Sequence, residues 1–547
     1  MNGKQIYLYA VASGLFLALA FPPLPFSAFA FVGLVPLLFA LENRPKHIFL
    51  TLYITFFIYH FGTNWWISSW QSETDPYLFV SGLATALVHP FFFFIPFIPY
   101  FFVKKRIGTA KALWFLPFYW AAFEWFHGLG ELSYPWLALG YTQINNFYWV
   151  QFADLAGVTG VSFIIVLINV LILKIIFTIK SIGTKEPKTT KILTNPASLR
   201  YTVPLMLLIV VPYIYGAIRV DKFDHEKLLK SNEKINIGIV QASINPWRKW
   251  ETSAMGQIGK HMQISDSLIA SVPKLDAIVW SETGILYVNK ETNFDHNFFI
   301  IRRWLDKYGI SLISGFADMK LYKKGEKPSI AAKAFRGDSS MIYDSYNSLL
   351  LLNPAEVDKS PQIYHKMRLT PFGERIPYLE IFSFARKWLE WNVGISSWAI
   401  GQEQKNLILK TKDGKAITFA PVICIESIYP GFIREFVNMG AELIVIITND
   451  AWYDYTFGPE QHFQIARMRA IETRRYVARC ANTGVSGFIA ANGETLLRAP
   501  QYQALGIALT IPVVNDNSVY TVYGDWIVNV SLFLALFSVI LAFVKQK

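Results

Sequence analysis

The stretch Pro421-Val422-Ile423-Cys424-Ile425-Glu426-Ser427 combines the pattern of a buried strand with a cysteine at its end, and the turn signal Tyr429-Pro430-Gly431 follows it. Other short apolar runs on either side have the same strand-like character and alternate with amphipathic helical patterns. The strands are expected at 235–241, 277–280, 311–316, 348–352, 421–425 and 443–448, and the helices at 252–272, 291–308, 429–439 and 459–475. This alternation predicts an α/β domain with helices packed on sheets.

The chain as a whole is too apolar for an ordinary soluble protein. Of the 547 residues, 53% are hydrophobic and only 16% are charged, against about 25% charged in an ordinary soluble domain. A membrane span needs about 20 mostly apolar residues. Seven candidate spans precede the α/β domain and one follows it, at 5–21, 25–42, 48–70, 77–103, 110–127, 157–179, 201–219 and 525–544.

Loop charges predict the orientation of these spans. If the N-terminus is cytoplasmic, the inside segments hold fourteen Lys and Arg but only two Glu, and the short outside loops 71–76 and 128–156 hold no Lys or Arg. The net charge of +12 is therefore a topology signal and does not indicate nucleic-acid binding. We expect a membrane domain at 1–219, a water-facing catalytic domain at 220–523, which in a bacterium would be periplasmic, and a last span with a cytoplasmic tail at 524–547.

Three chemically active side chains are expected at strand ends. Cys424 ends one apolar run, Glu282 follows Trp280-Ser281, and Lys366 precedes the loop Pro371-Phe372-Gly373-Glu374. Each has a plainer interpretation, because most free cysteines pack in cores and most Lys and Glu are solvated. Together they offer a thiol, a base and a cation. That set suits acyl transfer, in which the carboxylate takes the thiol proton and the ammonium lowers the thiol pKa and stabilises the oxyanion.

Ordered motifs along the chain resemble the nitrilase superfamily, and more narrowly the bacterial apolipoprotein N-acyltransferase family. They are Trp280-Ser281-Glu282-Thr283, the Lys366 segment with 371–374, Ile423-Cys424-Ile425-Glu426, Thr448-Asn449-Asp450-Ala451-Trp452, the run 461–470, and Asn482-Thr483-Gly484. The resemblance covers nearly the whole chain. It implies a multi-helix membrane domain joined to an αββα sandwich of the nitrilase type.

The resemblance also implies a reaction. Cys424 would take a fatty acyl chain from a membrane phospholipid as a thioester, and the N-terminal amine of the diacylglyceryl-cysteine of an apolipoprotein would then receive it in a ping-pong sequence. No cofactor or metal is implied, and we expect a monomer in the bacterial inner membrane. By the same resemblance Glu282 is the general base and Lys366 supports the tetrahedral intermediates; the supporting or substrate-side residues are Glu374, Glu426, Asn347, Trp250 and Trp452.

Other residues depart from the family pattern or stand outside it. Ile425 occupies a position where the family usually has Tyr. Cys480 is expected to be a buried structural thiol, with a Cys424–Cys480 disulfide as the alternative. His462 is expected on a helix surface or in a packing contact, not on a metal, because no second His stands at ligand spacing.

Two tryptophan-rich stretches suggest membrane contact. Trp65, Trp66 and Trp70 are expected to form an interfacial belt, where Trp is favoured. The stretch 382–400 contains Trp388 and Trp391 and few charges. It is either ordinary packing or a lid that dips into the bilayer interface.

Two alternatives to an acyltransferase remain open at this point. A membrane-tethered amidase of the nitrilase type would use the same three residues with water as the acceptor. A non-enzymatic membrane partner or scaffold would keep the fold without the chemistry, and the intact Glu, Lys and Cys set argues against it.

Overall fold

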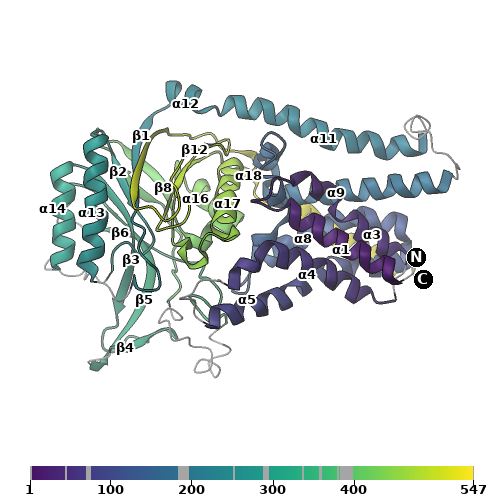
Figure 1. Cartoon of the computed structure of the whole chain (residues 1–547), viewed down its shortest axis with the longest axis horizontal. Helices are drawn as coiled ribbons and strands as arrows, with labels where there is room; N and C mark the ends of the chain where they lie inside the picture. The colour runs from purple at the N-terminus through teal and green to yellow at the C-terminus, as the bar shows by residue number, and fades with distance from the viewer. Residues whose placement is uncertain are drawn as a thin grey trace.

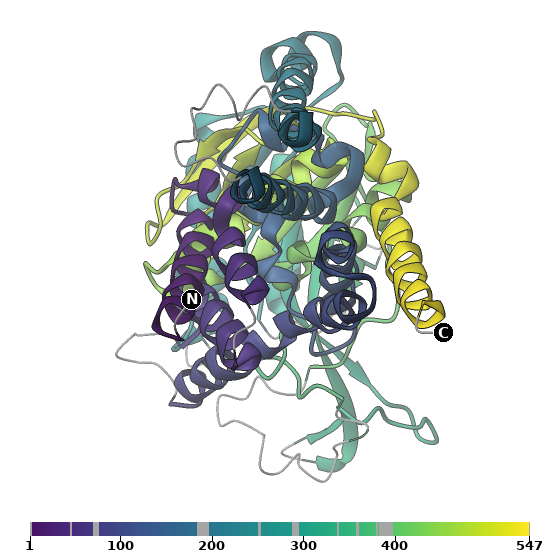
Figure 2. The ribbon, with the colours of Figure 1, turned by 90° about the vertical axis from the view of Figure 1, so that its right-hand side faces the viewer.

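The computed structural model describes residues 3–43, 46–68, 76–182, 196–249, 253–286, 295–335, 338–356, 360–378, 381 and 398–545. It has two parts, a bundle of apolar helices and an α/β sandwich, which lie end to end along the longest axis (Figure 1). The predicted fold class is confirmed. Helix α1 begins and helix α19 ends at the same end of that axis, on opposite flanks of the bundle (Figure 2).

The bundle is built from the first half of the chain and its last helix. Its helices are α1 Gly3–Ala20, α2 Ala30–Gly33, α3 Val35–Glu42, α4 Ile48–Asn64, α5 Pro76–Val88, α6 Phe97–Ile107, α7 Thr109–Ala112, α8 Leu116–His127, α9 Ala153–Ile182, α11 Pro196–Lys222 and α19 Trp526–Val544. A helix or helical pair therefore occupies each of the eight ranges predicted as spans.

Not every predicted span is one long helix. Over the described residues, five helical segments are long and apolar enough to cross a membrane: Gly3–Ala20, Leu78–Ile107, Trp149–Ser181, Pro196–Lys222 and Trp526–Val544. The predicted span at 25–42 is divided between α2 and α3, and α8 has only 12 residues. Proline stands in the first turn of both α3 and α8, a position that suits a helix start and not a helix interior.

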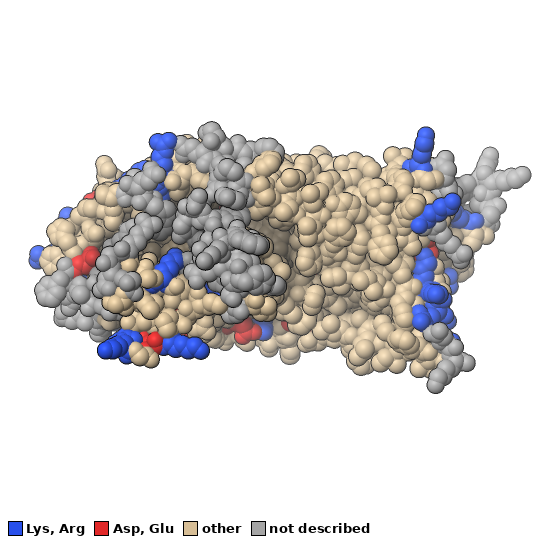
Figure 3. All heavy atoms as spheres, turned by 90° about the horizontal axis from the view of Figure 1, so that it is seen from below, with Lys and Arg blue, Asp and Glu red and all other residues tan. Residues whose placement is uncertain are grey.

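The surface of the bundle matches a lipid environment. Figure 3 shows a broad band free of Lys, Arg, Asp and Glu over the helical half, bounded by basic residues at the far end of the molecule. Lys4, Lys105, Lys111, Arg200 and Lys545, all exposed, lie at the helix ends on that side. Charged side chains are costly in hydrocarbon and are tolerated at its edge.

The α/β part contains two sheets in the described residues. The first has the order β13-β1-β2-β3-β5-β4, with β6 also paired to β5, and the second has the order β12-β11-β10-β9-β8-β7. The first-sheet strands are β1 Lys234–Gln241, β2 Ala277–Trp280, β3 Ser311–Leu321, β4 Lys333–Phe335, β5 Asp338–Leu352, β6 Gln362–His365 and β13 Leu505–Pro512; the second-sheet strands are β7 Leu407–Lys410, β8 Ala416–Ile423, β9 Leu443–Thr448, β10 Tyr476–Ala481, β11 Gly487–Ile489 and β12 Thr495–Arg498.

Helices cover the outer face of each sheet, which gives an αββα sandwich. Helices α13 Ala254–Ser271 and α14 His296–Tyr308 cover the first sheet, whereas α16 Pro430–Asn438 and α17 Phe457–Thr473 lie on the second (Figure 1). Alternate strand residues serve the two sides, as the pleat requires. Ile237 and Val279 join the core between the sheets, while Ile278 and Trp280 pack with the α13 and α14 layer.

The second helix layer also contacts the bundle. Helix α17 touches α4 and α9, and the short helix α18 Val519–Tyr523 touches α9; α12 His225–Ser231 links α11 to β1. One continuous buried cluster runs from bundle residues such as Leu17 and Trp120 to Val422 and Ile446 of the second sheet. The two parts therefore share a core and are not joined by a linker alone.

A buried carboxylate ties the two parts together. Asp154, in the first turn of α9, accepts hydrogen bonds from Arg474 at the end of α17 at 2.8 and 3.0 Å and from Tyr215 of α11 at 2.8 Å. The Arg219 guanidinium lies 2.7 Å from the same carboxylate. The Arg474 and Asp154 side chains are 0% and 1% exposed. Each charge is therefore removed from water and compensated by the other.

Replacing Asp154 by Ala is expected to destabilise the protein by about 3 to 5 kcal/mol, the usual cost of leaving a buried charge without its partner. Arg474 and Arg219 would then face each other without a carboxylate between them. Thermal unfolding of the purified protein in detergent micelles measures the effect. Asp221→Ala is the matched control, because the Asp221–Lys227 pair is 73% and 59% exposed and such pairs contribute about 1 kcal/mol or less. Equal melting temperatures for the two variants would contradict this role of Asp154.

Candidate active site

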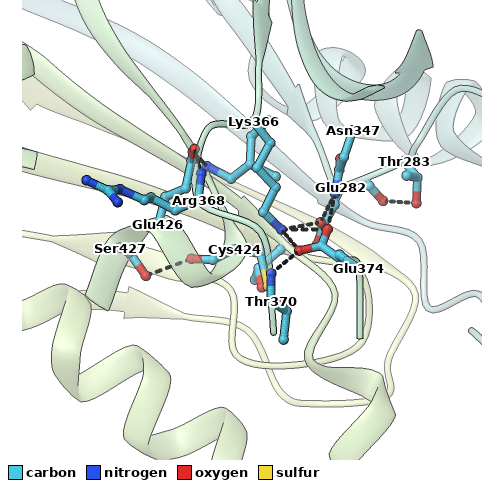
Figure 4. Close-up of polar contacts among 12 residues, drawn as sticks. Glu282, Thr283, Asn347, Lys366, Arg368, Thr370, Glu374, Cys424, Glu426 and Ser427 are labelled. Atoms are coloured by element: carbon cyan, nitrogen blue, oxygen red, sulfur yellow. Dashed lines mark hydrogen bonds and ion pairs between the residues drawn. The ribbon is translucent and has the colours of Figure 1, made fainter. Parts of the chain in front are cut away.

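Three strand ends bring the predicted residues together. Glu282 lies two residues after β2, and Lys366 directly follows β6, both in the first sheet. Cys424 directly follows β8 of the second sheet and opens the 3-10 turn Cys424–Ile428. The side chains of Glu282, Lys366 and Glu374 converge beside the Cys424 sulfur (Figure 4). The site therefore lies where the ends of the two sheets meet.

A buried ammonium organises the carboxylates. Lys366 Nζ lies 2.9 Å from the Glu374 carboxylate and 3.5 Å from Glu282 Oε1. Asn347 of β5 donates from its amide nitrogen to both carboxylates, at 2.7 Å to Glu282 and 2.8 Å to Glu374. The backbone N–H of Thr370 donates to the second oxygen of Glu374 at 2.8 Å. Each carboxylate is thus held in one orientation by at least two partners.

Left-handed residues occur in all three loops that carry these groups. Cys424 has φ 50°, Thr283 next to Glu282 has φ 50°, and Phe372 in the loop before Glu374 has φ 61°. Side chains with a Cβ rarely adopt this conformation, and such residues gather at functional sites where the surroundings hold them in place. At Cys424 the sharp turn ends the strand and presents the thiol toward Lys366.

Glu426 holds the cysteine turn against the Lys366 loop. One of its oxygens accepts from Ile423 N–H at 2.9 Å, and the other accepts from Met367 N–H and the Tyr364 hydroxyl, both at 2.7 Å, and from Arg368 N–H at 3.2 Å. Burial raises the pKa of Glu426 to about 7 even though these donors favour the carboxylate. This side chain therefore joins the end of β8 to the end of β6.

Burial and the neighbouring charges act on the Cys424 thiol in opposite directions. The pKa of the Cys424 thiol is raised, first by burial and then by the Glu282 charge, and Lys366 opposes this rise without cancelling it. Burial alone would lower the pKa of Lys366, but Glu374 and Glu282 raise it, so the lysine is an ammonium. Lys366 also holds the pKa of Glu374 below its usual value, against the effect of burial. Lys366 thus lowers the thiol pKa, as the sequence predicted, but burial and the neighbouring carboxylates raise it by more.

His462 is not on a helix surface, contrary to the first of the two sequence expectations. It lies buried behind the cysteine turn, with Nε2 2.8 Å from Ser427 Oγ and 3.2 Å from the Cys424 carbonyl, and Nδ1 2.9 Å from Asp450 Oδ1. Arg479 of β10 donates to the other Asp450 oxygen at 2.6 Å. Trp136 packs against the imidazole at a ring distance of 5.3 Å. A lone His in a helical pattern gives no signal of such a network.

Lys249 is a site residue that the sequence did not single out. Its ammonium donates to the Glu282 carbonyl at 3.0 Å and to Thr283 Oγ1 at 2.7 Å. Burial lowers the pKa of Lys249 to about 7. Lys249 thus fixes the backbone that carries Glu282. It directly precedes Trp250, a predicted substrate-side residue, but nothing in the local sequence indicates that this lysine is buried.

The structure places some of the remaining predicted residues, and others lie outside the described part of the chain. Trp452 packs at 4.9 Å against Trp247, near the segment that carries Lys249. Both cysteines are free, and Cys480 is a buried thiol that donates to carbonyls of β1 and β2, as expected. Trp66 is 2% exposed and bonds to Gln461 of α17, so it is not part of a lipid-facing belt. The positions outside the described residues are Trp250, Trp70, Trp388 and Trp391.

Comparisons with known proteins agree with this division of the chain. Residues 13–171 match the model of the apolipoprotein N-acyltransferase N-terminal domain, and residues 236–511 match the carbon-nitrogen hydrolase model. A protein of Chlorobaculum tepidum named apolipoprotein N-acyltransferase is 31% identical over 99% of this chain and 97% of its own length. The chain belongs to the apolipoprotein N-acyltransferase family. The family resemblance drawn from the sequence motifs is thereby confirmed.

Other members of the apolipoprotein N-acyltransferase family are also similar from end to end. A relative of the same name in Geobacter metallireducens is 27% identical over 95% of this chain and 92% of its own length. Among solved structures, a carbon-nitrogen hydrolase of Helicobacter pylori is 14% identical with a TM-score of 0.37, and the match covers 54% of this chain and 94% of that one.

Glu426→Gln is expected to lower the free energy of unfolding by about 1 to 3 kcal/mol, the cost of an unsatisfied buried polar group. Hydrogen-bond donors face both carboxylate oxygens, and a Gln amide offers only one acceptor oxygen. Its NH₂ would meet another donor. Thermal unfolding in detergent checks this, with Glu403→Gln as the control, because Glu403 is 71% exposed in its pair with Lys405. A Gln variant that melts at the wild-type temperature would show that Glu426 does not hold the turn through these bonds.

Proposed function

We propose that this chain transfers a fatty acyl chain from a membrane phospholipid, through a thioester on Cys424, to the N-terminal amine of the diacylglyceryl-cysteine of an apolipoprotein. The names and full-length similarity of the relatives support the acceptor. The observation that carries the chemistry is the Lys366 ammonium, held between Glu282 and Glu374 beside a thiol on a left-handed turn. The charge-free band of the bundle supports a substrate that arrives from lipid.

The first half-reaction consumes the phospholipid. Glu282 takes the Cys424 proton as the sulfur attacks the carbonyl carbon of the phospholipid ester. The oxyanion of the tetrahedral intermediate forms next to the Lys366 ammonium, which stabilises it. The intermediate collapses with cleavage of the carbon–oxygen bond, and the departing glycerol oxygen takes the proton from Glu282. The products are a thioester on Cys424 and a lysophospholipid.

The second half-reaction uses the thioester. The α-amine of the acceptor attacks the thioester carbonyl, and Glu282 removes a proton from that nitrogen. Lys366 again lies beside the oxyanion. The carbon–sulfur bond then breaks, an amide forms, and the proton returns from Glu282 to the Cys424 sulfur. One thiol serves both halves, so the lysophospholipid leaves before the amine attacks.

Glu374, Asn347 and Glu426 are positioning residues in this scheme. Glu374 balances the Lys366 charge while Asn347 orients both carboxylates, so Glu282 remains free to exchange a proton. Glu426 holds the turn that carries the thiol. In this proposal Trp452 and Trp250 lie near the substrates. Trp388 and Trp391 belong to a lid over the site.

We further propose a membrane domain at 1–219, a catalytic domain at 220–523 and a last helix with a short tail at 524–547. The chain would act as a monomer in a bacterial inner membrane, with the catalytic domain in the periplasm. The exposed basic residues at the end of the bundle away from the sandwich support a cytoplasmic location for that end.

The amidase alternative would use the same residues with water as the acceptor. The core shared between bundle and sandwich favours the acyltransferase, because it fixes the site next to the membrane. The family likewise favours the acyltransferase. The alternatives differ in the fate of the thioester, which persists without an acceptor only in an acyltransferase.

Incubating the purified protein with phospholipid alone is expected to add one acyl chain to Cys424, visible in the intact mass and in a Cys424 peptide. Cys424→Ser should abolish the thioester adduct. Lys366→Ala and Glu282→Ala should slow its formation at least about 10²-fold, the usual scale for a lost base or oxyanion partner. Cys480→Ala is the matched control, because its thiol is buried and bonded to backbone carbonyls.

With both substrates present, double-reciprocal plots at varied donor and acceptor should give parallel lines. Intersecting lines would contradict a free acyl-enzyme. Release of fatty acid from phospholipid without an acceptor, at a rate near the wild-type turnover, would favour the amidase.

A reporter active only in the periplasm, fused after Lys547, should be silent, and the same reporter inserted in the β3–β4 loop at Gly325 should be active. The exposed basic ends of the helices are the physical reason. Gly325 has open space around its Cα and lies in an exposed turn, so the insertion spares the core. The opposite pattern of reporter activity would reverse the proposed orientation.

A further inference from the structure

A small cavity lies between the two parts of the molecule, beside the catalytic residues. One wall is the segment 130–133, which follows α8 of the bundle, and the other is the segment 367–377 of the sandwich. Its volume is about 40 Å³, room for a group of only a few heavy atoms, since one water needs about 10 to 15 Å³ on this measure. An acyl chain does not fit there.

The residues that line the cavity are close in the chain to those of the candidate active site. Arg368, which lines it, lies two residues after Lys366, and its N–H donates to Glu426. Arg375, also in the lining, directly follows Glu374. Tyr429 completes this side and directly follows the 3-10 turn of Cys424. A group bound in the cavity would therefore contact residues that lie one or two positions from Lys366 and Glu374 and five positions from Cys424.

The cavity carries a net positive charge. Arg368 and Arg375 face it with one carboxylate, Glu131, whose oxygen lies 3.7 Å from Arg375 Nε and accepts from the Tyr378 N–H at 2.8 Å. The Arg375 side chain is only 6% exposed. Among the described residues that line the cavity, two guanidinium groups and one carboxylate leave one positive charge, which matches a single monoanion.

The donor groups suit a phosphate ester. A guanidinium presents a planar fork of N–H groups that fits two oxygens of a phosphate or carboxylate. The hydroxyls of Ser133 and Tyr429 line the same space, but they donate to the backbone carbonyls of Gly130 at 2.7 Å and of Ser133 at 3.1 Å, so the donors available to a bound anion are the two guanidinium groups. The wall at 130–133 directly follows α8, at the end of the bundle nearest the sandwich. Lipid phosphates lie at that level in a bilayer, just outside the hydrocarbon.

We propose that this cavity binds the phosphodiester of the donor phospholipid, with Arg368 and Arg375 as specificity-determining residues for the first half-reaction. The inference rests on the proposed function and deepens it. The anchored phosphodiester places the neighbouring glycerol ester within reach of Cys424. The diacylglyceryl-cysteine acceptor has no phosphate, so the two arginines contribute to donor binding and not to acceptor binding.

The test separates the two half-reactions. Arg368→Gln and Arg375→Lys are compared with wild type for acylation of Cys424 by phosphatidylethanolamine and by a neutral activated ester, p-nitrophenyl palmitate. The KM for the phospholipid should rise about 10- to 100-fold, the scale of lost charge-assisted hydrogen bonds. The neutral ester should acylate all variants equally. The acyl-enzyme made with it should react with the acceptor lipopeptide at an unchanged KM.

Arg303→Gln is the matched control, since this exposed arginine on α14 loses the same charge on the opposite side of the sandwich. Inorganic phosphate, at a concentration on the order of tens of millimolar, supplies a second probe. It should compete with the phospholipid, not with the neutral ester, and should compete less well in Arg375→Lys.

Three outcomes would overturn the inference. Equal losses with both donors would mean a structural role for the arginines, and a raised acceptor KM would assign the cavity to the acceptor. Unchanged phospholipid KM in both variants would leave the cavity without a headgroup role. Failure of wild type to form an acyl-enzyme with either donor would instead reject the proposed function itself.

Discussion

A charged lysine buried at the meeting point of two sheets is the constraint around which the site is built. Only 1% of the Lys366 side chain is exposed, and an ammonium removed from water requires carboxylates and hydrogen bonds around it. Glu374 and Glu282 supply the charge, and Asn347 keeps the two carboxylates from turning away. The same arrangement brings two carboxylates, an ammonium and the Cys424 thiol together at one point, where the ends of the two sheets meet.

Helix α17 attaches the site to the bundle. Helix α17 carries His462 behind the cysteine turn, Gln461 bonded to Trp66 and Trp136 of the bundle, and Arg474 bonded to Asp154 after its last turn. A displacement of α17 would therefore move the catalytic turn and the bundle contacts together. The wall of the arginine-lined cavity comes from both parts as well, so its shape depends on the same docking.

The sequence predicted the elements whose patterns are local. Buried strands such as β9 and amphipathic helices such as α14 have clear periodicity, and the strand ends at Glu282, Lys366 and Cys424 followed from them. Strand β10 was not predicted, because Arg479 interrupts its apolar run and finds its partner, Asp450, in another element. Lys249 and His462 were missed or misassigned for the same reason. Lys249 bonds to Glu282 and His462 bonds to Ser427, each more than 30 residues away in the chain, and no local pattern encodes such distant hydrogen bonds.

The last helix has a consequence for how the protein is made. Helix α19 packs against α6, α8 and α9, and the Tyr119 hydroxyl lies 2.6 Å from Ser538 Oγ inside that contact. The chain thus returns to its first half only after the whole sandwich has been synthesised. The contacts of α19 with α6, α8 and α9 can therefore form only after residues 526–544 have been made, so the packing of the bundle is finished later than the synthesis of the sandwich.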